Sequence, residues 1–152
     1  MKNVLKLLPL AMLMACGSIK GPTTEIMPPA DKTTLSDIYR PYSYSATVVD
    51  VYDGDTFTLD FEIGFSLRYE DVIRLARVDT PELRGEERPE GIKVRDQVEK
   101  LILSKRVIAQ TDEDDRGKYG RLLTEIYFED QSCTCWVNLS DYLLQRGMAE
   151  LY

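Results

Sequence analysis

The sequence predicts an α+β fold in which five short β-strands form a small barrel accompanied by two helices. β-Branched and apolar residues occur in short runs around turn signals, which is typical of strands. One longer segment, residues 86–104, changes to a helical period. A length of 152 residues with 43% hydrophobic content suits one globular core. These three observations decide the fold class.

The first two strands are predicted to form a hairpin. Residues 45–51 are rich in β-branched side chains and end at Asp53-Gly54, a strong turn signal. The return strand is predicted over residues 56–61. A third strand is predicted from about residue 72 to 78, after a connection centred on Gly64. Three such strands are a plausible start for a small barrel.

The helix predicted over residues 86–104 is amphipathic. Its apolar face consists of Val94, Val98, Leu101 and Ile102. Pro89 and Gly91 mark its irregular start. Another strand, residues 107–111, leads into a polar loop over residues 112–120, and a fifth strand follows at residues 122–128.

A second helix is predicted near the C-terminus. Asn138 or Ser140 could cap it, it continues through Leu143 and Leu144, and Gly147 closes it. The element order is therefore three strands, a helix, two strands and a helix. This order is expected of an OB-type five-stranded barrel, an architecture often used to bind oligonucleotides.

Composition limits the chemistry that this protein can perform. It has 19 basic and 26 acidic residues, a net charge of −7, which argues against binding nucleic acid through a general basic surface. Any polyanion must then be bound locally. The chain has no histidine, which excludes imidazole metal sites, Ser-His-Asp triads and histidine acid–base catalysis. Carboxylates, Arg, Lys and Tyr must carry any reaction.

The first sixteen residues are typical of an export signal. Lys2 and Lys6 precede an apolar run, residues 7–15, that is too short to span a bilayer. Residues 13–16, Leu-Met-Ala-Cys, resemble the lipobox of bacterial lipoproteins, in which the cysteine is acylated and becomes the mature N-terminus. An ordinary signal peptide with a chance cysteine is the alternative. Without residues 1–15 the chain keeps 17 basic and 26 acidic residues, a net charge of −9.

We therefore expect three regions: a signal peptide (1–15), a tether rich in Pro, Thr, Ser and Lys that starts at lipidated Cys16 (16–42), and a folded domain (43–152). The domain is expected outside the cytoplasm, lipid-anchored to the cell membrane, or to the outer membrane if the cell has one. Lipidation of Cys16 leaves Cys133 and Cys135 as a pair. A Cys-x-Cys disulfide closes a very small ring, so we expect either a labile bridge or two free thiols.

Short motifs place charged residues where the predicted strands end. They are Asp53-Gly54-Asp55-Thr56, Arg74, Asp79-Thr80-Pro81-Glu82 and Lys118-Tyr119-Gly120-Arg121. Their types and order resemble the staphylococcal nuclease (thermonuclease) family over about residues 45–149. The resemblance implies an SNase-like OB-type barrel with nuclease activity.

A calcium ion is the cofactor that the resemblance implies. Asp55 and Asp79 lie at predicted strand ends and offer hard oxygen ligands, which suit Ca²⁺. By resemblance, Asp55, Asp79 and the main-chain carbonyl of Thr80 hold the ion, and water completes its coordination. Turn chemistry alone explains Asp53 at least as well as a role beside the metal.

Three residues are candidates for catalysis. Pro81 restricts the backbone before Glu82 and so limits where that carboxylate can point. In the family the matching glutamate lies near the attacking water, as general base or as the acceptor that orients it. Arg74 and Arg121 carry planar, permanent charges that can bind phosphate oxygens as negative charge builds on phosphorus. Arg74 lies in an otherwise apolar strand, where an arginine needs an anionic partner.

The remaining polar residues near these motifs are assigned less directly. Lys118 and Tyr119 resemble the family's contacts to substrate phosphate, although a loop lysine is equally well explained as a solvated side chain. Tyr152 is a candidate for the aromatic residue that the family places over the substrate base. Arg77 follows Arg74 by three residues, so strand alternation places it on the opposite face and outside the site.

The reaction implied by the resemblance is metal-assisted hydrolysis of phosphodiester bonds in DNA or RNA, leaving 3′-phosphate and 5′-hydroxyl ends. We expect a monomer. The alternative is a non-catalytic OB-fold nucleic-acid-binding module or a structural surface lipoprotein. Arg74, Glu82 and Arg121 together favour the enzyme, because a binding module has no need of all three. The family's further C-terminal helix is expected to have no counterpart here.

Overall fold

The computed structural model describes residues 34–152, except for the side chains of Asp37 and Asp114. The predicted signal peptide, Cys16 and the tether as far as residue 33 lie outside the described residues. Helix α1 (Leu35–Ile38) falls within the range predicted as tether. Its Ile38 side chain is buried, so the packed part of the chain begins before the expected boundary at residue 43.

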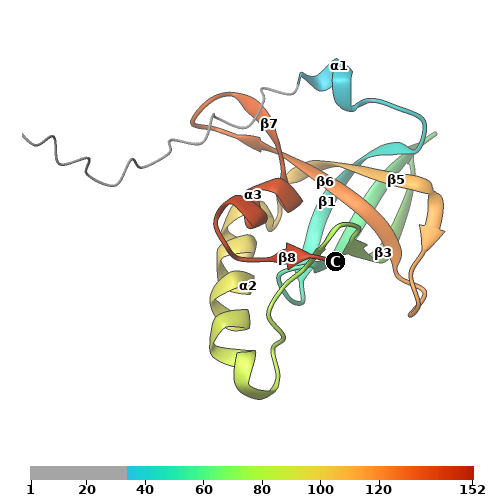
Figure 1. Ribbon diagram of the computed structural model, residues 1–152. Coiled ribbons are helices and arrows are strands. Elements are labelled where there is room, and N and C mark those ends of the chain that lie inside the picture. The colour runs from blue at the N-terminus through green and yellow to red at the C-terminus, as the bar shows by residue number, and fades with distance from the viewer. Residues whose placement is uncertain (1–33) are drawn as a thin grey trace, which may run out of the picture.

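Five strands close into a barrel (Figure 1). They are β1 (Ser43–Val51), β2 (Thr56–Gly64), β3 (Leu67–Leu75), β5 (Arg106–Arg116) and β6 (Leu122–Asp130). Antiparallel pairs give the order β3-β2-β1-β5-β6, and β3 then pairs in parallel with β6, where Arg74 lies opposite Leu123. The five-stranded OB-type barrel predicted from the sequence is confirmed.

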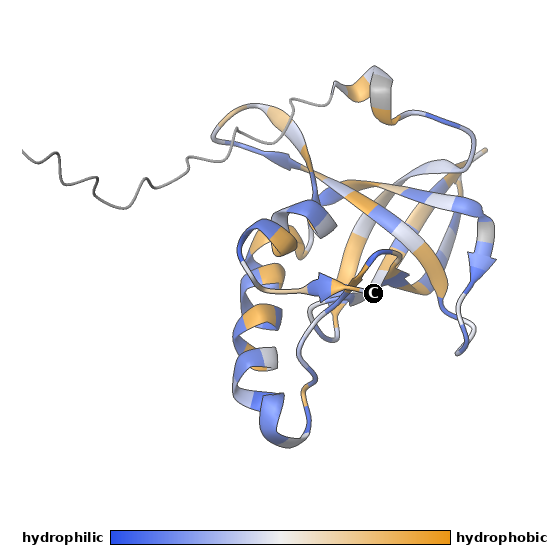
Figure 2. Cartoon of the chain, in the orientation of Figure 1, coloured by the Kyte–Doolittle hydropathy of each residue, from blue (hydrophilic) through white to orange (hydrophobic). Residues whose placement is uncertain are grey.

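Alternation along the strands builds the core. In β2 the side chains of Phe57, Leu59 and Phe61 are buried, whereas the residues between them are partly exposed. Figure 2 shows the corresponding alternation of apolar and polar residues along the strands and along the long helix. All buried hydrophobic side chains in the described part lie between Ile38 and Leu143. Within residues 34–152, the core therefore extends from α1 to α3 (Leu139–Gln145).

Two helices accompany the barrel, as predicted. Helix α2 (Arg88–Ile102) follows a 3₁₀ turn, η1 (Gly85–Glu87), and buries Val94 and Val98 against the strands. Helix α3 (Leu139–Gln145) begins after Asn138, whose side chain accepts a hydrogen bond of 3.0 Å from the amide of Asp141. Asn138, rather than Ser140, is therefore the cap. Within residues 34–152, no helix has the length and apolar character needed to span a membrane.

Two strands are longer than the sequence predicts. Strand β3 begins at Leu67, not near residue 72, because Phe65 and Ser66 form a two-residue turn without the Gly, Asn or Pro signals of a hairpin. Strand β5 continues over residues 112–116, which were predicted as loop. Its pairing with β6 shifts register between Thr111 and Arg116, an irregularity that breaks the alternation from which strands are predicted.

Three short strands were not predicted. Strand β4 (Val78–Asp79) pairs with β8 (Glu150–Leu151), which ties the end of the chain to the segment after β3. Strand β7 (Cys135–Asn138) lies beside β6 and extends the sheet. Segments of two to four residues are too short to show a period of two.

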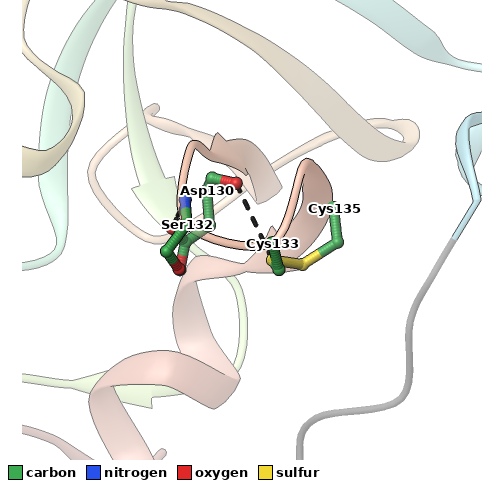
Figure 3. Close-up of a disulfide and its surroundings, with 4 residues drawn as sticks. All are labelled: Asp130, Ser132, Cys133 and Cys135. Atoms are coloured by element: carbon green, nitrogen blue, oxygen red, sulfur yellow. Dashed lines mark hydrogen bonds between the residues drawn. A yellow bond between two sulfur atoms is a disulfide. The ribbon is translucent and has the colours of Figure 1, made fainter.

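A disulfide joins Cys133 and Cys135 in the turn between β6 and β7 (Figure 3). Asp130 holds this turn, because its side chain accepts a hydrogen bond of 2.8 Å from the amide of Ser132. Its carbonyl accepts another, of 3.3 Å, from the amide of Cys133. Of the two states expected for this pair, the structure has the bridged one.

Candidate active site

A cavity of about 300 Å³ lies where β3, the segment after β4, the β5–β6 loop and the end of the chain meet. Its lining consists of Arg74, Leu75, Ala76, Asp79, Glu82, Gly117, Lys118, Tyr119, Arg121, Leu123 and Tyr152. All three candidate catalytic residues are among them, together with Asp79, Lys118 and Tyr119. Of the candidate metal ligands, Asp55 and Thr80 do not line it. Asp55 forms an ion pair with Arg74, which does line the cavity. Thr80 lines a neighbouring hollow, and Asp79 lines both.

Arg74 joins two carboxylates. Its Nη1 donates to Oδ1 of Asp55 at 3.0 Å, and its Nη2 donates to Oδ1 of Asp79 at 2.6 Å. Partial burial would lower the pKa of Arg74, but the hydrogen bond to Asp79 and the charge of Asp55 outweigh this effect and raise it. An arginine in an apolar strand was expected to have an anionic partner, and Arg74 has two, Asp55 and Asp79.

Asp55 is the buried carboxylate of the site. Its residue surface is only 2% exposed, and Oδ1 accepts a hydrogen bond of 2.9 Å from the Thr56 hydroxyl. Burial and the charge of Asp53 raise the pKa of Asp55 to about 7, against the opposing effects of Arg74 and Thr56. One arginine therefore does not fully compensate the burial of this carboxylate.

Gly54 allows the turn that carries Asp55 to pack tightly. A Cβ atom at Gly54 would lie 2.7 Å from a methyl group of Val94 and 2.8 Å from the hydroxyl oxygen of Thr80. Only glycine fits at this distance. The turn is thereby pressed against both helix α2 and the segment that contains Asp79 and Thr80.

Glu82 is positioned by a second close approach. A Cβ atom at Gly91, in the first turns of α2, would lie 2.5 Å from the carbonyl oxygen of Pro81 and 2.6 Å from that of Glu82. The amide of Glu82 also donates to Oε2 of Glu87 at 3.2 Å. Gly91 was predicted only as part of an irregular helix start. Its structural role is to let the helix backbone contact the backbone of the Pro81–Glu82 segment.

The loop after β5 brings Arg121 to the cavity. Nη1 of Arg121 donates to the Thr56 hydroxyl at 2.9 Å, and that hydroxyl donates in turn to Asp55. The Arg121 guanidinium and the Lys118 ammonium lie 5.6 and 5.5 Å from the centre of the Tyr119 ring. Thr56 thus links the second arginine to the buried carboxylate.

Sequence reasoning missed Arg116. Its Nη1 donates to the carbonyl of Gly120 at 2.6 Å, and its Nη2 donates to Asp71 of β3 at 2.7 Å. The hydroxyl of Tyr69 also donates to Asp71 at 3.0 Å. Arg116 therefore fixes the loop that carries Lys118 to strand β3. No local signal could have identified it, because residues 112–120 read as one polar loop.

The end of the chain forms one wall of the cavity. The β4–β8 pair places Asp79 opposite Glu150, and the amide of Tyr152 donates to the carbonyl of Arg77 at 2.9 Å. The Tyr152 ring then lies with its centre 5.5 Å from the guanidinium carbon of Arg74. The aromatic candidate predicted from the sequence is thus in the cavity.

Arg77 lies outside this cavity, as predicted, but for a different reason. Strand β3 ends at Leu75, so alternation does not extend to residue 77. Its guanidinium donates to Glu125 at 2.7 Å and to Asp141 at 2.9 Å. Both contacts raise the pKa of Arg77 above its ordinary value. These bonds connect the segment after β3 to β6 and α3, which makes Arg77 structural.

The oxygen atoms that could hold a metal ion come from few side chains. Within residues 34–152, no three Asp, Glu or Cys side chains gather closely enough to form a site by themselves. Asp55 and Asp79 nevertheless converge, because both contact the same guanidinium of Arg74. Main-chain carbonyls and water would have to complete any coordination around these two carboxylates.

Sequence comparison identifies the family of this chain. A family model described as staphylococcal nuclease homologue matches residues 72–152, just over half of the 152 residues. The matched segment includes Arg74, Glu82 and Arg121, and the residues of β3 and β6 that pair in parallel to close the barrel. No curated protein matches the chain. On the family match and the closed barrel with two helices, this chain belongs to the staphylococcal nuclease homologue family.

Proposed function

We propose that this protein is a calcium-dependent nuclease that hydrolyses phosphodiester bonds in DNA or RNA and leaves 3′-phosphate and 5′-hydroxyl ends. One observation carries the proposal: Arg74, Glu82 and Arg121, which come from three separate segments, line a single cavity. Membership in a nuclease-type family supports the same reaction class. No Ser or Cys side chain lines the cavity, and in the proposed reaction the attacking group is water.

The two arginines would bind the phosphate and stabilise the charge that develops in the transition state. Each is held by an acceptor on the protein, Arg74 by the two aspartates and Arg121 by Thr56. Guanidinium groups that are already oriented need little rearrangement when negative charge builds on the phosphate oxygens. Removing one such preorganised donor typically costs about 10²–10³ in kcat.

Glu82 would act on the attacking water, either by accepting its proton or by orienting it. Glu82 is exposed and lines the cavity, and its main-chain amide donates to Glu87. The backbone contact between Gly91 and Glu82 holds the main chain of this residue in place. Glu82 thus shares the cavity with the two arginines, as the proposed hydrolytic step requires.

The residues present fit a calcium ion by the chemistry of their donor atoms. Asp55 and Asp79 would provide carboxylate oxygens and Thr80 a main-chain carbonyl, with water in the remaining positions. Asp55 is buried and only partly compensated by Arg74, which favours an additional cation. Members of this family are generally calcium-dependent. When bound, the ion would supply positive charge toward the phosphate and toward water.

A local concentration of positive charge would allow an acidic protein to bind a polyanion. The chain carries a net charge of −7, and the charges of Arg74, Arg121 and Lys118 in the cavity are offset by those of Asp79, Glu82 and the adjoining Asp55. A bound calcium ion would therefore supply the local excess of positive charge. Lys118 and Tyr119 are exposed on the loop above it and would contact substrate phosphate. Because the salt dependence of binding scales with the number of cations that contact phosphate, binding through so few should weaken only moderately as salt concentration rises.

We also propose that the protein is exported, lipidated on Cys16 and displayed outside the cytoplasm as a monomer. The motif at residues 13–16 supports this proposal. Mass spectrometry of the mature protein tests it directly: an acylated Cys16 at the N-terminus is expected, and Cys16→Ser should abolish the modification. Cleavage elsewhere without acylation would overturn it.

The nuclease proposal is tested with residues 17–152 on single-stranded DNA and RNA, with Ca²⁺ and with a chelator. Glu82→Gln and Arg121→Ala should each lower calcium-dependent cleavage at least about a hundredfold. Glu86→Gln and Arg68→Ala are matched controls, because both side chains lie outside the cavity. End-group analysis of the products tests for 3′-phosphate. A folded protein that binds DNA without cutting it would instead support a non-catalytic OB-fold module.

A further inference from the structure

The turn between β2 and β3 carries the most exposed large apolar side chain in the described part of the chain. Phe65 is 98% exposed, and Ile63 and Leu67 on either side of it are 47% and 59% exposed. Single exposed apolar residues are common on protein surfaces. Three within one hairpin turn, with an aromatic ring projecting at its tip, form a small apolar cap.

The backbone of this turn makes Phe65 an unfavourable choice. Phe65 and Ser66 have φ angles of 52° and 62°. Positive φ at both central residues is characteristic of a type I′ turn, in which Asn and Gly are strongly preferred. Phenylalanine there is strained and also exposes its ring to water. Since asparagine would make the same turn with less strain, the presence of Phe65 points to a role outside the fold.

The turn lies at the end of the barrel where the chain enters from residues 1–33. Ser45 pairs with Glu62, so the start of β1 lies beside the end of β2. The hydroxyl of Ser43 donates to the carbonyl of Ile38 at 3.0 Å, which ties α1 to this end. Tyr39 and Tyr42 are also about half exposed here. Aromatic side chains with a polar tip suit a boundary between lipid and water.

The cavity lies toward the opposite end of β2. Thr56, which contacts Arg121, begins this strand, and Gly64 ends it. Nine residues of strand extend roughly 26 Å. A surface touching the turn would therefore lie at the far end of this strand from the cavity.

Most charges beside the turn are paired, and Glu70, opposite Asp60, adds one exposed acid. Arg68 pairs with Asp60 and with Glu62, and Arg106 pairs with Glu62 at 2.5 Å. These ion pairs beside the turn neither strongly attract nor strongly repel a zwitterionic headgroup. An uncharged apolar tip beside mostly paired charges fits the interface of a neutral lipid layer better than a nucleic acid, which would require unpaired cations.

We propose that the cap formed by Ile63, Phe65 and Leu67 is a second membrane contact, inserted shallowly into the lipid surface to which Cys16 is anchored. The inference rests on the proposed anchor. Residues 17–33 can extend at most about 60 Å, so the anchor keeps the domain close to lipid. Three side chains are too few for a stable protein interface, which needs about 800 Å² per partner. They suffice for a weak contact that adds to an existing anchor.

The test replaces the natural anchor, so that it does not depend on lipidation. Residues 17–152 keep the whole described core and contain no histidine, so an N-terminal hexahistidine tag binds them by one end to phosphatidylcholine vesicles with a nickel-chelating lipid. Phe65→Trp is made in a Trp136→Phe background, which removes the single native tryptophan. Tyr52→Trp in the same background is the matched control, because Tyr52 is 61% exposed near the cavity end of the β1–β2 hairpin.

On these vesicles, the fluorescence of Trp at position 65 should shift to shorter wavelength and be quenched by acyl-brominated lipid several-fold more than that of Trp at position 52. Equal quenching at both positions, or quenching at neither, would overturn the proposal. A blue shift at position 65 that grows with protein concentration without vesicles would also overturn it, in favour of contact between two copies.

Phe65→Asn separates the membrane contact from folding. It should leave the thermal midpoint unchanged or raise it, because the turn is relieved. On vesicles, Leu67→Trp in the Trp136→Phe background should lose most of its quenching by acyl-brominated lipid when Phe65→Asn is added. If Phe65→Asn instead lowers the thermal midpoint, Phe65 has a structural role and the proposal fails. Cleavage of single-stranded DNA in solution, without vesicles, should be the same for this variant and the unmodified chain. The nuclease and the membrane contact can therefore fail separately.

Discussion

The guanidinium of Arg74 lies 2.6 Å from the carboxylate of Asp79, four residues beyond the end of the same strand. The same guanidinium also donates a hydrogen bond to Asp55, which immediately precedes strand β2. One arginine therefore joins two acidic segments that the sequence separates. Several expected outcomes depend on this junction and on the close contacts around it.

Replacing Arg74 should separate its structural role from its catalytic role. Arg74→Ala leaves the buried Asp55 without this partner and should lower the free energy of unfolding in chelator by roughly 3 kcal/mol, as measured by urea unfolding. Arg74→Lys keeps the charge and should recover most of that stability. Cleavage should still fall about a hundredfold, because lysine lacks the planar fork. Full activity in Arg74→Lys would contradict a phosphate-binding role for Arg74.

The pairing of Asp71 should appear in the acid dependence of stability. Burial acts to raise the pKa of Asp71, but hydrogen bonds from Arg116, the amide of Val72 and Tyr69 outweigh it and hold the pKa below its usual range. A folded pKa below the unfolded value gives stability that is present above about pH 4 and is lost as pH falls through the folded pKa.

Asp71→Asn should therefore lower the free energy of unfolding at pH 7 by at most about 1 kcal/mol, the usual value for an exposed pair. As the pH falls below about 4, the difference between the variant and the unmodified protein should shrink. Urea midpoints across this range are the measurement, with Glu70→Gln on the same strand as control. A difference that stays constant down to pH 2 would show that Asp71 acts through something other than its charge.

Arg116 should affect substrate binding more than chemistry. It bonds the carbonyl of Gly120 and so positions the loop that carries Lys118 and Tyr119. Arg116→Ala should raise KM several-fold with kcat changed much less, because the loop contacts substrate without touching the reacting atoms. Steady-state kinetics on a short oligonucleotide measures both constants. A fall in kcat alone would place Arg116 in the chemical step instead.

Gly91→Ala should impair the site through the backbone. The added methyl carbon would lie 2.5 Å from the carbonyl oxygen of Pro81 and 2.6 Å from that of Glu82, which is closer than van der Waals contact allows. Either the helix or the Glu82 segment must therefore move. We expect a loss of roughly 1–3 kcal/mol in stability together with reduced cleavage. Glu99→Ala, exposed on the same helix, is the control and should change neither. Unchanged activity in Gly91→Ala would remove the positioning role of this contact.

The disulfide should matter little for activity. Cys133 and Cys135 lie in the turn between β6 and β7, and neither lines the cavity. Because the bridge closes a very small ring, replacing both cysteines by serine should cost no more than about 2 kcal/mol in unfolding free energy. Cleavage should be unchanged. Loss of cleavage in a folded double variant would link this turn to the site.

Local patterns in the sequence determined much of the fold. The turn at Asp53-Gly54, the alternation in β2 and the helical period of α2 are properties of neighbouring residues, so they could be predicted. The turn at Phe65-Ser66 and the irregular end of β5 were missed. In each case the backbone adopts a conformation that the side chains do not signal.

The candidate site shows the same difference between what local sequence patterns predict and what depends on tertiary contacts. Motif resemblance alone selected Arg74, Glu82 and Arg121, because the residue types and their order are written in the chain. Only the tertiary structure decided that they share one cavity, since the parallel β3–β6 pair and the β4–β8 pair join segments that are distant in sequence. It also decided the roles of Gly91 and Arg116, whose contacts are with backbone atoms elsewhere. Such contacts leave no local pattern, because they depend on which surfaces meet after the barrel has closed.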